Sequence, residues 1–192
     1  MPPTLQEPVR SFVAIEFPHQ VHDLCARIQQ DLAPKLHGVS WVKRGNVHLT
    51  LKFLGNITST QRDSILPSLQ AAAAAQGPFV IELGGVGVFP DLRRPRVIWL
   101  GMSQGKRACV ALASSIDASL SKLGFVAERK PVRPHLTLGR IRRSVDASVL
   151  QSLETQYEEL GLPAIRVEQI VLMQSVLSSK GSIYTPLSHF PL

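Results

Sequence analysis

The sequence predicts a two-lobed fold of alternating strands and helices, in which two similar strand–helix–strand–helix–strand units face each other across a cleft. Three observations lead to this prediction. The string His-Leu-Thr-Leu occurs twice, at 48–51 and at 135–138, an offset of 87 residues. The segments flanking one copy align with those flanking the other at that offset, as expected for an internal duplication. No connecting segment is long or polar enough to separate independent domains.

The first unit begins with a strand, a helix and a second strand. Residues 10–17 are rich in β-branched and aromatic types and predict a strand. Pro18 suits the first turn of a helix running to about 32, which Pro34 would stop. Residues 47–54 alternate polar and apolar types, which indicates a half-buried strand ending at Gly55.

The first unit then continues with a helix and a third strand. Ser59 or Thr60 is expected to cap a helix that includes the alanine run 71–75. Pro67 is expected to kink or interrupt this helix. The glycines within 79–89 suggest a strand with a bend or bulge.

The second unit is expected to repeat this order and to add a closing edge strand. A basic loop at 91–96 leads into it, and a second basic loop at 125–134 precedes the second motif. The predicted elements are a strand at 97–102, a helix at 105–123 closed by Gly124, a strand at 135–141, a helix at 146–160 ended by Gly161, one long or two short strands over 165–177 and an edge strand at 182–190. We therefore expect a loose tail at 1–9 and one domain over 10–192, with lobes of roughly 10–90 and 91–192 and a possible crossover of terminal strands.

Size and composition indicate a globular protein able to bury a core. The chain has 192 residues, of which 44% are hydrophobic and 18% charged. No apolar run is long enough for a membrane helix, and the first residues do not resemble a signal peptide. Cys25 and Cys109 are too few for a disulfide framework or zinc site, so we expect two buried thiols and a cytoplasmic protein.

The formal net charge of +7 favours an anionic partner such as a nucleic acid, a nucleotide or a membrane surface. Basic residues gather in two stretches. The first stretch contains Arg93, Arg94 and Arg96. The second contains Arg129, Lys130, Arg133, Arg140, Arg142 and Arg143.

The two His-x-Thr pairs carry the chemistry that the sequence predicts. Alternate residues of a strand share a face, so His48 and Thr50 point one way and the leucines the other, as do His135 and Thr137. Two histidines can act as acid and base near neutral pH, and hydroxyls and arginines can hold a phosphate. The sequence therefore predicts in-line displacement at a phosphodiester without a metal; no metal-ligand spacing accompanies the motifs.

The longer strings around these motifs are SFVAI at 11–15, WV at 41–42, HLTLKFLG at 48–55, VIWLG at 97–101, RPHLTLGR at 133–140 and YTPL at 184–187. They resemble the two-histidine (2H) phosphoesterase superfamily. Within it they are most similar to the LigT-like RNA 2′,3′-cyclic phosphodiesterases of bacteria and archaea, once called 2′–5′ RNA ligases. The resemblance covers the chain from Arg10 onward.

The resemblance implies a bilobal α+β fold with antiparallel-rich sheets and an active site in the central cleft. It implies that His48 donates a proton to the leaving oxygen and that His135 accepts one from water. Thr50, Thr137 and Arg140 would bind the phosphate. The implied product is an RNA 2′-phosphomonoester, formed by an enzyme without a metal or organic cofactor.

Strand alternation conflicts with the implied role of Arg140, because it places Gly139 on the histidine face and Arg140 on the core face. We expect a bulge or strand end at Gly139 to turn Arg140 back. The same alternation places Lys52 on the face of His48 and Phe53 in the core. The further candidate substrate contacts are Lys52, Arg133, Trp41 and Tyr184, with Phe12 as another candidate for stacking on a base.

Several functions remain open at this point. A 2′–5′ RNA ligase or a 2′,5′-oligonucleotide phosphodiesterase would use the same residues as a cyclic phosphodiesterase. A non-catalytic module that binds RNA ends is an alternative of another class, and it would show salt-dependent binding without turnover. We expect the partner to be RNA with a 2′,3′-cyclic phosphate end or a related cyclic nucleotide, with no membrane partner and a monomeric protein.

Overall fold

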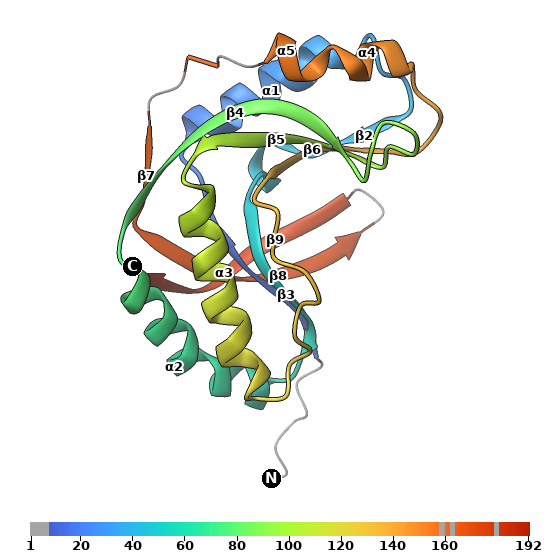
Figure 1. The fold of residues 1–192 in the computed structure, drawn as a ribbon. Helices are drawn as coiled ribbons and strands as arrows, with labels where there is room; N and C mark the ends of the chain where they lie inside the picture. The colour runs from blue at the N-terminus through green and yellow to red at the C-terminus, as the bar shows by residue number, and fades with distance from the viewer. Residues whose placement is uncertain (1–7, 158–159, 162–163, 179–180) are drawn as a thin grey trace.

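The computed structural model of the chain describes residues 8–157, 160–161, 164–178 and 181–192 (Figure 1). Strands and helices alternate along most of the chain. Their order is β1 (Val9–Ile15), α1 (His19–Leu32), β2 (Val39–Trp41), the 3₁₀ turn η1 (Arg44–Asn46), β3 (Leu49–Ile57), α2 (Ser59–Gln76), β4 (Phe79–Phe89), β5 (Val97–Gln104), α3 (Lys106–Ser121), β6 (Leu136–Ile141), α4 (Ala147–Gln151), α5 (Leu153–Gln156), β7 (Ile165–Val167), β8 (Gln169–Ser178) and β9 (Gly181–Pro191).

The described strands form two antiparallel sheets. The first has the order β3-β1-β8-β9, and the second has the order β2-β6-β5-β4-β7. The α+β class and the antiparallel sheets expected from the sequence are therefore confirmed. The segment 165–177 forms two strands, and β9 is the edge strand expected near the end of the chain.

The sheets do not follow a boundary near residue 90. Strand β4 precedes that boundary and yet pairs with β5, whereas β8 lies far beyond it and pairs with β1. The helices cross over as well, since α1 contacts β6 and α3 contacts β3. Strands β3-β1-β8 of one sheet and β6-β5-β4 of the other occupy matching places.

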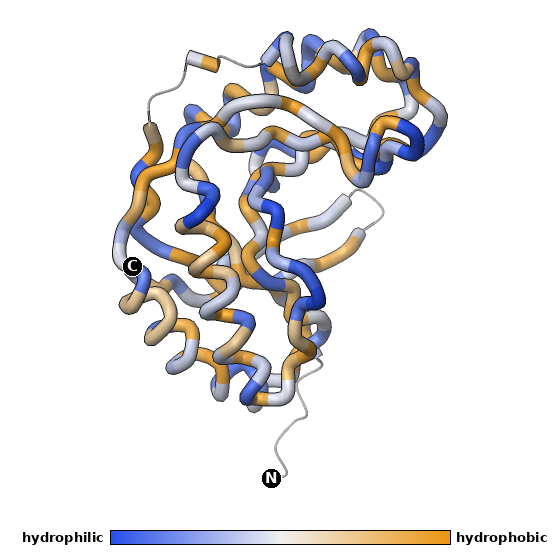
Figure 2. Tube along the Cα trace, in the orientation of Figure 1, coloured by the Kyte–Doolittle hydropathy of each residue, from blue (hydrophilic) through white to orange (hydrophobic). Residues whose placement is uncertain are grey.

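One main hydrophobic core joins the inner faces of helices and sheets, and a smaller cluster lies around Phe12 on the other face of β1. Figure 2 shows hydrophobic residues along the strands and hydrophilic stretches in the loops between them. Cys25 and Cys109 are free and buried, as expected, and burial raises the pKa of each thiol to about 12. No helix among the described residues is both long and apolar enough to cross a membrane.

Helix α2 continues through Pro67, so of the kink or interruption expected there the interruption is wrong. Ile65 and Leu69, on either side of the proline, are fully buried, and the helix packs against α3. Burial on both sides offsets the loss of one helical hydrogen bond. The cap lies one or two residues earlier than expected, because Thr58 and Gln61 form a reciprocal capping box.

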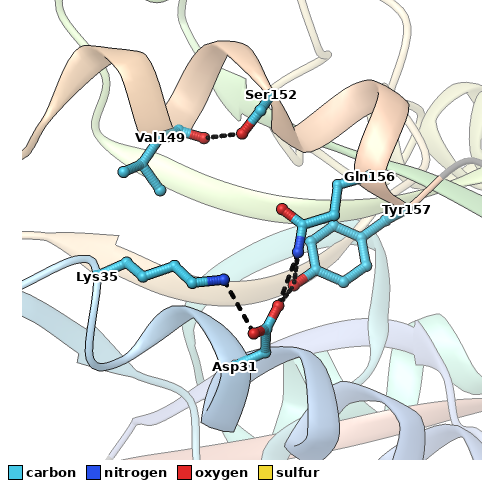
Figure 3. A network of polar contacts seen from close by, with 6 residues as sticks. All are labelled: Asp31, Lys35, Val149, Ser152, Gln156 and Tyr157. Carbon is cyan, nitrogen blue, oxygen red and sulfur yellow. Dashed lines mark hydrogen bonds and ion pairs between the residues drawn. The ribbon is translucent and has the colours of Figure 1, made fainter.

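The helix expected over 146–160 is wrong in its length, because it is divided into α4 and α5 and ends at Gln156. Tyr157 leaves the helical conformation, and its hydroxyl donates to the Asp31 carboxylate on α1 (Figure 3). Gln156 Nε2 donates to the same carboxylate at 2.8 Å, and Lys35 contacts it at 3.0 Å. These contacts anchor the end of α5 on α1, and residues 158–159 lie outside the described part.

Candidate active site

The two motif strands lie in different sheets but contact each other. His48 directly precedes β3 and His135 directly precedes β6, and these two strands are in contact. The two imidazoles are close enough for the charge of His135 to lower the pKa of His48. The structure therefore brings together the two halves of the site predicted from the sequence.

Each imidazole is held by the backbone carbonyl two residues before it. His48 Nδ1 lies 2.8 Å from Asn46 O, and His135 Nδ1 lies 2.6 Å from Arg133 O. A carbonyl only accepts, so each Nδ1–H donates and the Nε2 atom of each neutral ring carries the lone pair. His48 Nε2 lies 3.1 Å from Thr50 Oγ1. Both rings thus present Nε2 as the atom available for proton transfer.

Strand β3 contains a β-bulge directly after its threonine. Along β1, Ala14 is paired with Thr50, whereas the neighbouring residue Val13 is paired with Lys52. Leu51 is therefore the extra residue on β3. An extra residue reverses the alternation of faces beyond it.

The bulge overturns two expectations from strand alternation. Lys52 was expected on the face of His48, but it is 2% exposed; Phe53 was expected in the core, but it is 59% exposed. Phe53 pairs with Phe12, and their ring centroids are 6.1 Å apart. Phe53 therefore shares the face on which the Phe12 ring meets His48 at 4.7 Å.

Lys52 makes structural contacts instead. Its Nζ atom donates to Asp117 Oδ1 at 2.5 Å and to Val126 O at 2.9 Å. Asp117 in turn accepts the backbone N–H of Glu128 at 3.1 Å. Lys52 thus joins β3 to α3 and to the loop that leads to His135, and it is not free to contact a substrate.

Strand β6 has a bulge at the matching position. Trp99 is paired with Thr137 and Ile98 with Gly139, so Leu138 is the extra residue. This is the irregularity expected near Gly139. It turns Gly139 toward the buried side and leaves Arg140 exposed.

Gly139 is required by a close approach of side chains from β2. A Cβ atom at this position would lie 2.6 Å from Val39 Cγ1 and 2.8 Å from Trp41 Cε3. Trp41 therefore packs over Gly139 and against the main core, on the face opposite Arg140. Trp41 does not lie beside the histidines, although the sequence analysis named it as a candidate substrate contact.

Two other candidates lie beside the histidines. The ring of Tyr184 meets that of His48 edge to face at 5.0 Å and contacts Phe12 at 5.2 Å. The guanidinium carbon of Arg133 lies 5.1 Å from the ring centroid of Phe89, which itself meets His135 edge to face at 4.9 Å.

Phe89 and Trp99 are neighbours of the site that sequence reasoning missed. Their rings lie 5.1 Å apart, and Trp99 is paired with Thr137. The Trp99 ring covers Gly87 and Gly101, where an added Cβ would approach it to 2.5 and 2.8 Å. Glycines on adjacent strands were the available signal for a flat-lying aromatic ring.

The electrostatics of the site favour neutral imidazoles in the free protein. Burial, chiefly, lowers the pKa of His48 to about 4, with smaller effects from the charges of His135 and Arg140; the hydrogen bond to Asn46 opposes them. Burial also lowers the pKa of His135, and Arg140 and Arg133 act in the same direction, against its own backbone hydrogen bond. Binding of an anion beside the histidines would raise their pKa values, because a negative charge stabilises the imidazolium form.

Two sheets that each present a histidine and a threonine, with an arginine beside them, define a site of the phosphoesterase class. A family model described as LigT-like phosphoesterase matches the chain twice, over residues 15–99 and 100–184. The chain belongs to the LigT-like phosphoesterase family.

Relatives and solved structures agree with this membership. An RNA 2′,3′-cyclic phosphodiesterase from Aquifex aeolicus is 36% identical over 96% of this chain and 97% of its own length. One from Methanothermobacter thermautotrophicus is 33% identical, covering 96% and 99%. Escherichia coli LigT complexed with 3′-AMP superposes with a TM-score of 0.79 at 26% identity, covering 97% of this chain and 99% of LigT.

Proposed function

We propose that this protein hydrolyses the 2′,3′-cyclic phosphodiester at RNA ends to a 2′-phosphomonoester, with His135 as base and His48 as acid. The observation that supports this most directly is the matched presentation of two imidazoles, each with Nδ1 on a backbone carbonyl. The curated relatives named RNA 2′,3′-cyclic phosphodiesterase support the substrate class.

The reaction needs one proton transfer at each end of an in-line displacement. His135 Nε2 takes a proton from water as the water oxygen bonds to phosphorus. The bond from phosphorus to O3′ breaks, and His48 Nε2–H gives its proton to O3′. Thr50, Thr137 and Arg140 would hold the non-bridging oxygens, and Arg140 would offset their charge.

The low pKa of His48 is compatible with the role of acid. Its pKa of about 4 describes the protein without substrate, where burial and nearby positive charges disfavour imidazolium. The negative charge of a bound phosphodiester favours imidazolium. Hydrogen bonding of Nδ1–H to Asn46 O also stabilises the charged ring.

The nucleoside is expected on the His48 side, because the sugar leaves phosphorus through O3′. Phe12 and Tyr184 contact His48 on that side, and Phe53 lies next to Phe12. Phe53 exposes the most ring surface of any of them for a base to stack on. The opposite side, at His135, carries Arg133 and Arg140 and is left for water.

Metal independence is part of this proposal. The guanidinium groups beside the histidines attract an anion and would repel a metal cation. Among the described residues, no three His, Cys, Asp or Glu side chains come together as metal ligands. We expect rates measured with and without EDTA to be equal.

The deciding experiment is incubation with RNA ending in a 2′,3′-cyclic phosphate, followed by identification of the terminal group. A 2′-phosphate formed by wild type, and lost in His48→Ala and His135→Ala, would support the proposal. A joined product would indicate the ligase, cleavage of 2′,5′-linked oligonucleotides alone would indicate the other phosphodiesterase, and binding without turnover would indicate the RNA-end module. Monomeric state and cytoplasmic location stay predictions, to be tested by light scattering and cell fractionation.

A further inference from the structure

A cavity of about 420 Å³ lies at one end of the second sheet and shares no lining residue with the histidine site. Its walls come from the loop between β4 and β5, from the segment after β6 and from α4. Its volume lies within the roughly 300–1,000 Å³ of small-molecule sites. Four arginines line it, namely Arg93, Arg96, Arg142 and Arg143.

The charges of these arginines are not offset by ion pairs. All four are exposed, and none takes part in an ion pair between described residues. The two carboxylates nearest to these arginines in the sequence, Asp91 and Asp146, accept hydrogen bonds from backbone N–H groups instead. Asp91 Oδ1 accepts the N–H groups of Arg93 and Arg94, at 2.8 and 3.1 Å, and Asp146 Oδ1 accepts that of Ser148 at the start of α4. Four like charges around one cavity repel each other, so an anion would stabilise it.

Part of the cavity wall is apolar. Leu92, Ile141 and Leu150 line it together with the arginines, and Leu150 is buried. Guanidinium groups beside an apolar wall suit a ligand that combines phosphate with an organic part. A nucleotide unit has this combination.

The cavity is joined to the histidine site by short segments. Arg140, which we place at the reacting phosphate, is followed directly by Ile141 in the cavity wall, and Ile141 N donates to Arg96 O at 2.9 Å. Arg142 is two residues from Arg140 in the sequence, so their Cα atoms lie no more than about 7 Å apart. The other wall begins just after Phe89, which contacts His135. Figures 1 and 2 show this hydrophilic β4–β5 loop lying next to the segment that enters α4.

We propose that this arginine cavity binds a backbone phosphate of the RNA strand that carries the cyclic end. The inference rests on the proposed function and deepens it, because it makes an RNA strand a better substrate than a cyclic mononucleotide. A mononucleotide reaches only the histidine site. A longer strand also reaches the arginines and gains a salt-dependent contact.

The test compares two substrates, adenosine 2′,3′-cyclic phosphate and a short oligoribonucleotide ending in a 2′,3′-cyclic phosphate. The variant is R93A/R143A, and the control is K106A/R107A, which removes the same charge from exposed positions at the opposite end of β5. In R93A/R143A, kcat/KM for the oligonucleotide should fall by about tenfold through KM. Values for the mononucleotide, and both values in the control, should stay within about twofold.

Binding of the oligonucleotide is measured in parallel by fluorescence anisotropy over a salt series. The slope of log Kd against log salt should become smaller by about 0.7 for each phosphate that the arginines no longer neutralise. Equal reductions in kcat/KM on both substrates, or no reduction on either, would overturn the proposal. Binding of tripolyphosphate that depends on the arginines, with oligonucleotide kinetics unchanged, would identify a free-anion site and would also overturn it.

Failure of the proposed function would look different. If wild type turned over neither substrate, the hydrolase proposal would fail, whereas the anisotropy series would still test the arginine cavity. Unfolding temperatures of all variants, measured by circular dichroism, identify any reduction in activity that comes from impaired folding.

Discussion

Lys52 Nζ lies 2.5 Å from Asp117 Oδ1, and the lysine side chain is 1% exposed while the carboxylate is 20% exposed. The pair joins a strand of the first sheet to a helix from the second half of the chain. Removing one partner of a buried ion pair leaves the other charge without compensation. Asp117→Asn should therefore lower the free energy of unfolding by about 3 kcal/mol, measured by urea denaturation. Asp63→Asn, at an exposed pair with Arg62, is the matched control and should change it by less than about 1 kcal/mol.

The same pair gives a pH dependence of stability. Lys52 chiefly, and the N–H of Glu128, lower the pKa of Asp117 in the folded protein. The Asp117 carboxylate takes up a proton at a higher pH in the unfolded chain than in the folded protein. Stability therefore falls as pH falls from the ordinary range of a carboxylate toward the lowered pKa. The Asn variant should lack this component. Identical slopes for wild type and variant between about pH 5 and 2 would contradict the assignment.

The two histidines should act as one unit. His48→Ala and His135→Ala should each lower the rate by on the order of 10²–10⁴, because each removes one end of a single proton-transfer step. The double variant should be little slower than either single variant. Initial rates on the cyclic oligonucleotide measure this. More than a tenth of wild-type turnover in a folded single variant would exclude an essential role for that histidine.

The pH profile of kcat/KM should be shifted toward acid. Catalysis requires His48 charged and His135 neutral, and burial lowers both pKa values in the free protein. Raising the pH above the lowered values removes the proton from His48, so kcat/KM should decline at a pH below the 6.5 of an ordinary histidine. The profile of kcat should lie at higher pH, because bound phosphate favours imidazolium. An alkaline limb of kcat/KM near 8 would contradict the expected acid shift.

A sulfur substitution separates the two roles. A substrate with sulfur in place of the bridging O3′ releases a thiolate, which leaves without needing a proton. His48→Ala should regain much of its lost rate on this substrate, whereas His135→Ala should stay inactive because water must still be deprotonated. Rescue of His135→Ala instead would reverse the assignment. Rescue of neither would mean that His48 does not protonate the leaving group.

Arg140 should stabilise charge in the transition state. Arg140→Ala should lower kcat/KM by about 10²-fold or more, and Arg140→Lys should recover only part of it, since lysine lacks the planar fork. Arg10→Ala, at an exposed position on β1, is the control. Normal kinetics in Arg140→Ala would remove this arginine from the site.

Most strands and helices, and the positions of the two histidines, could be predicted because they depend on local sequence patterns. The alternation around His48 and His135, the strand formers and the glycine-marked ends of helices identify most elements. The bulge in β3 could not be predicted from the same patterns, because an extra Leu51 leaves the residues on either side looking regular. The bulge in β6 was expected only because burying the charge of Arg140 would be costly. Arg140 is exposed, in agreement with that expectation. Burying the charge of Lys52 is costly as well, but its ion-pair partner Asp117 lies 65 residues away in the sequence.

The pairing of β1 with β8 constrains how the chain can be assembled during synthesis. Phe12 pairs with Met173, so one edge of β1 stays without its partner until nearly the whole chain has left the ribosome. Sheets built from such distant pairings form slowly, and their open edges invite pairing with other chains. Neither half of the chain can complete its own sheet, so a ribosome that stalls after β4 would release an aggregation-prone fragment rather than a small folded domain.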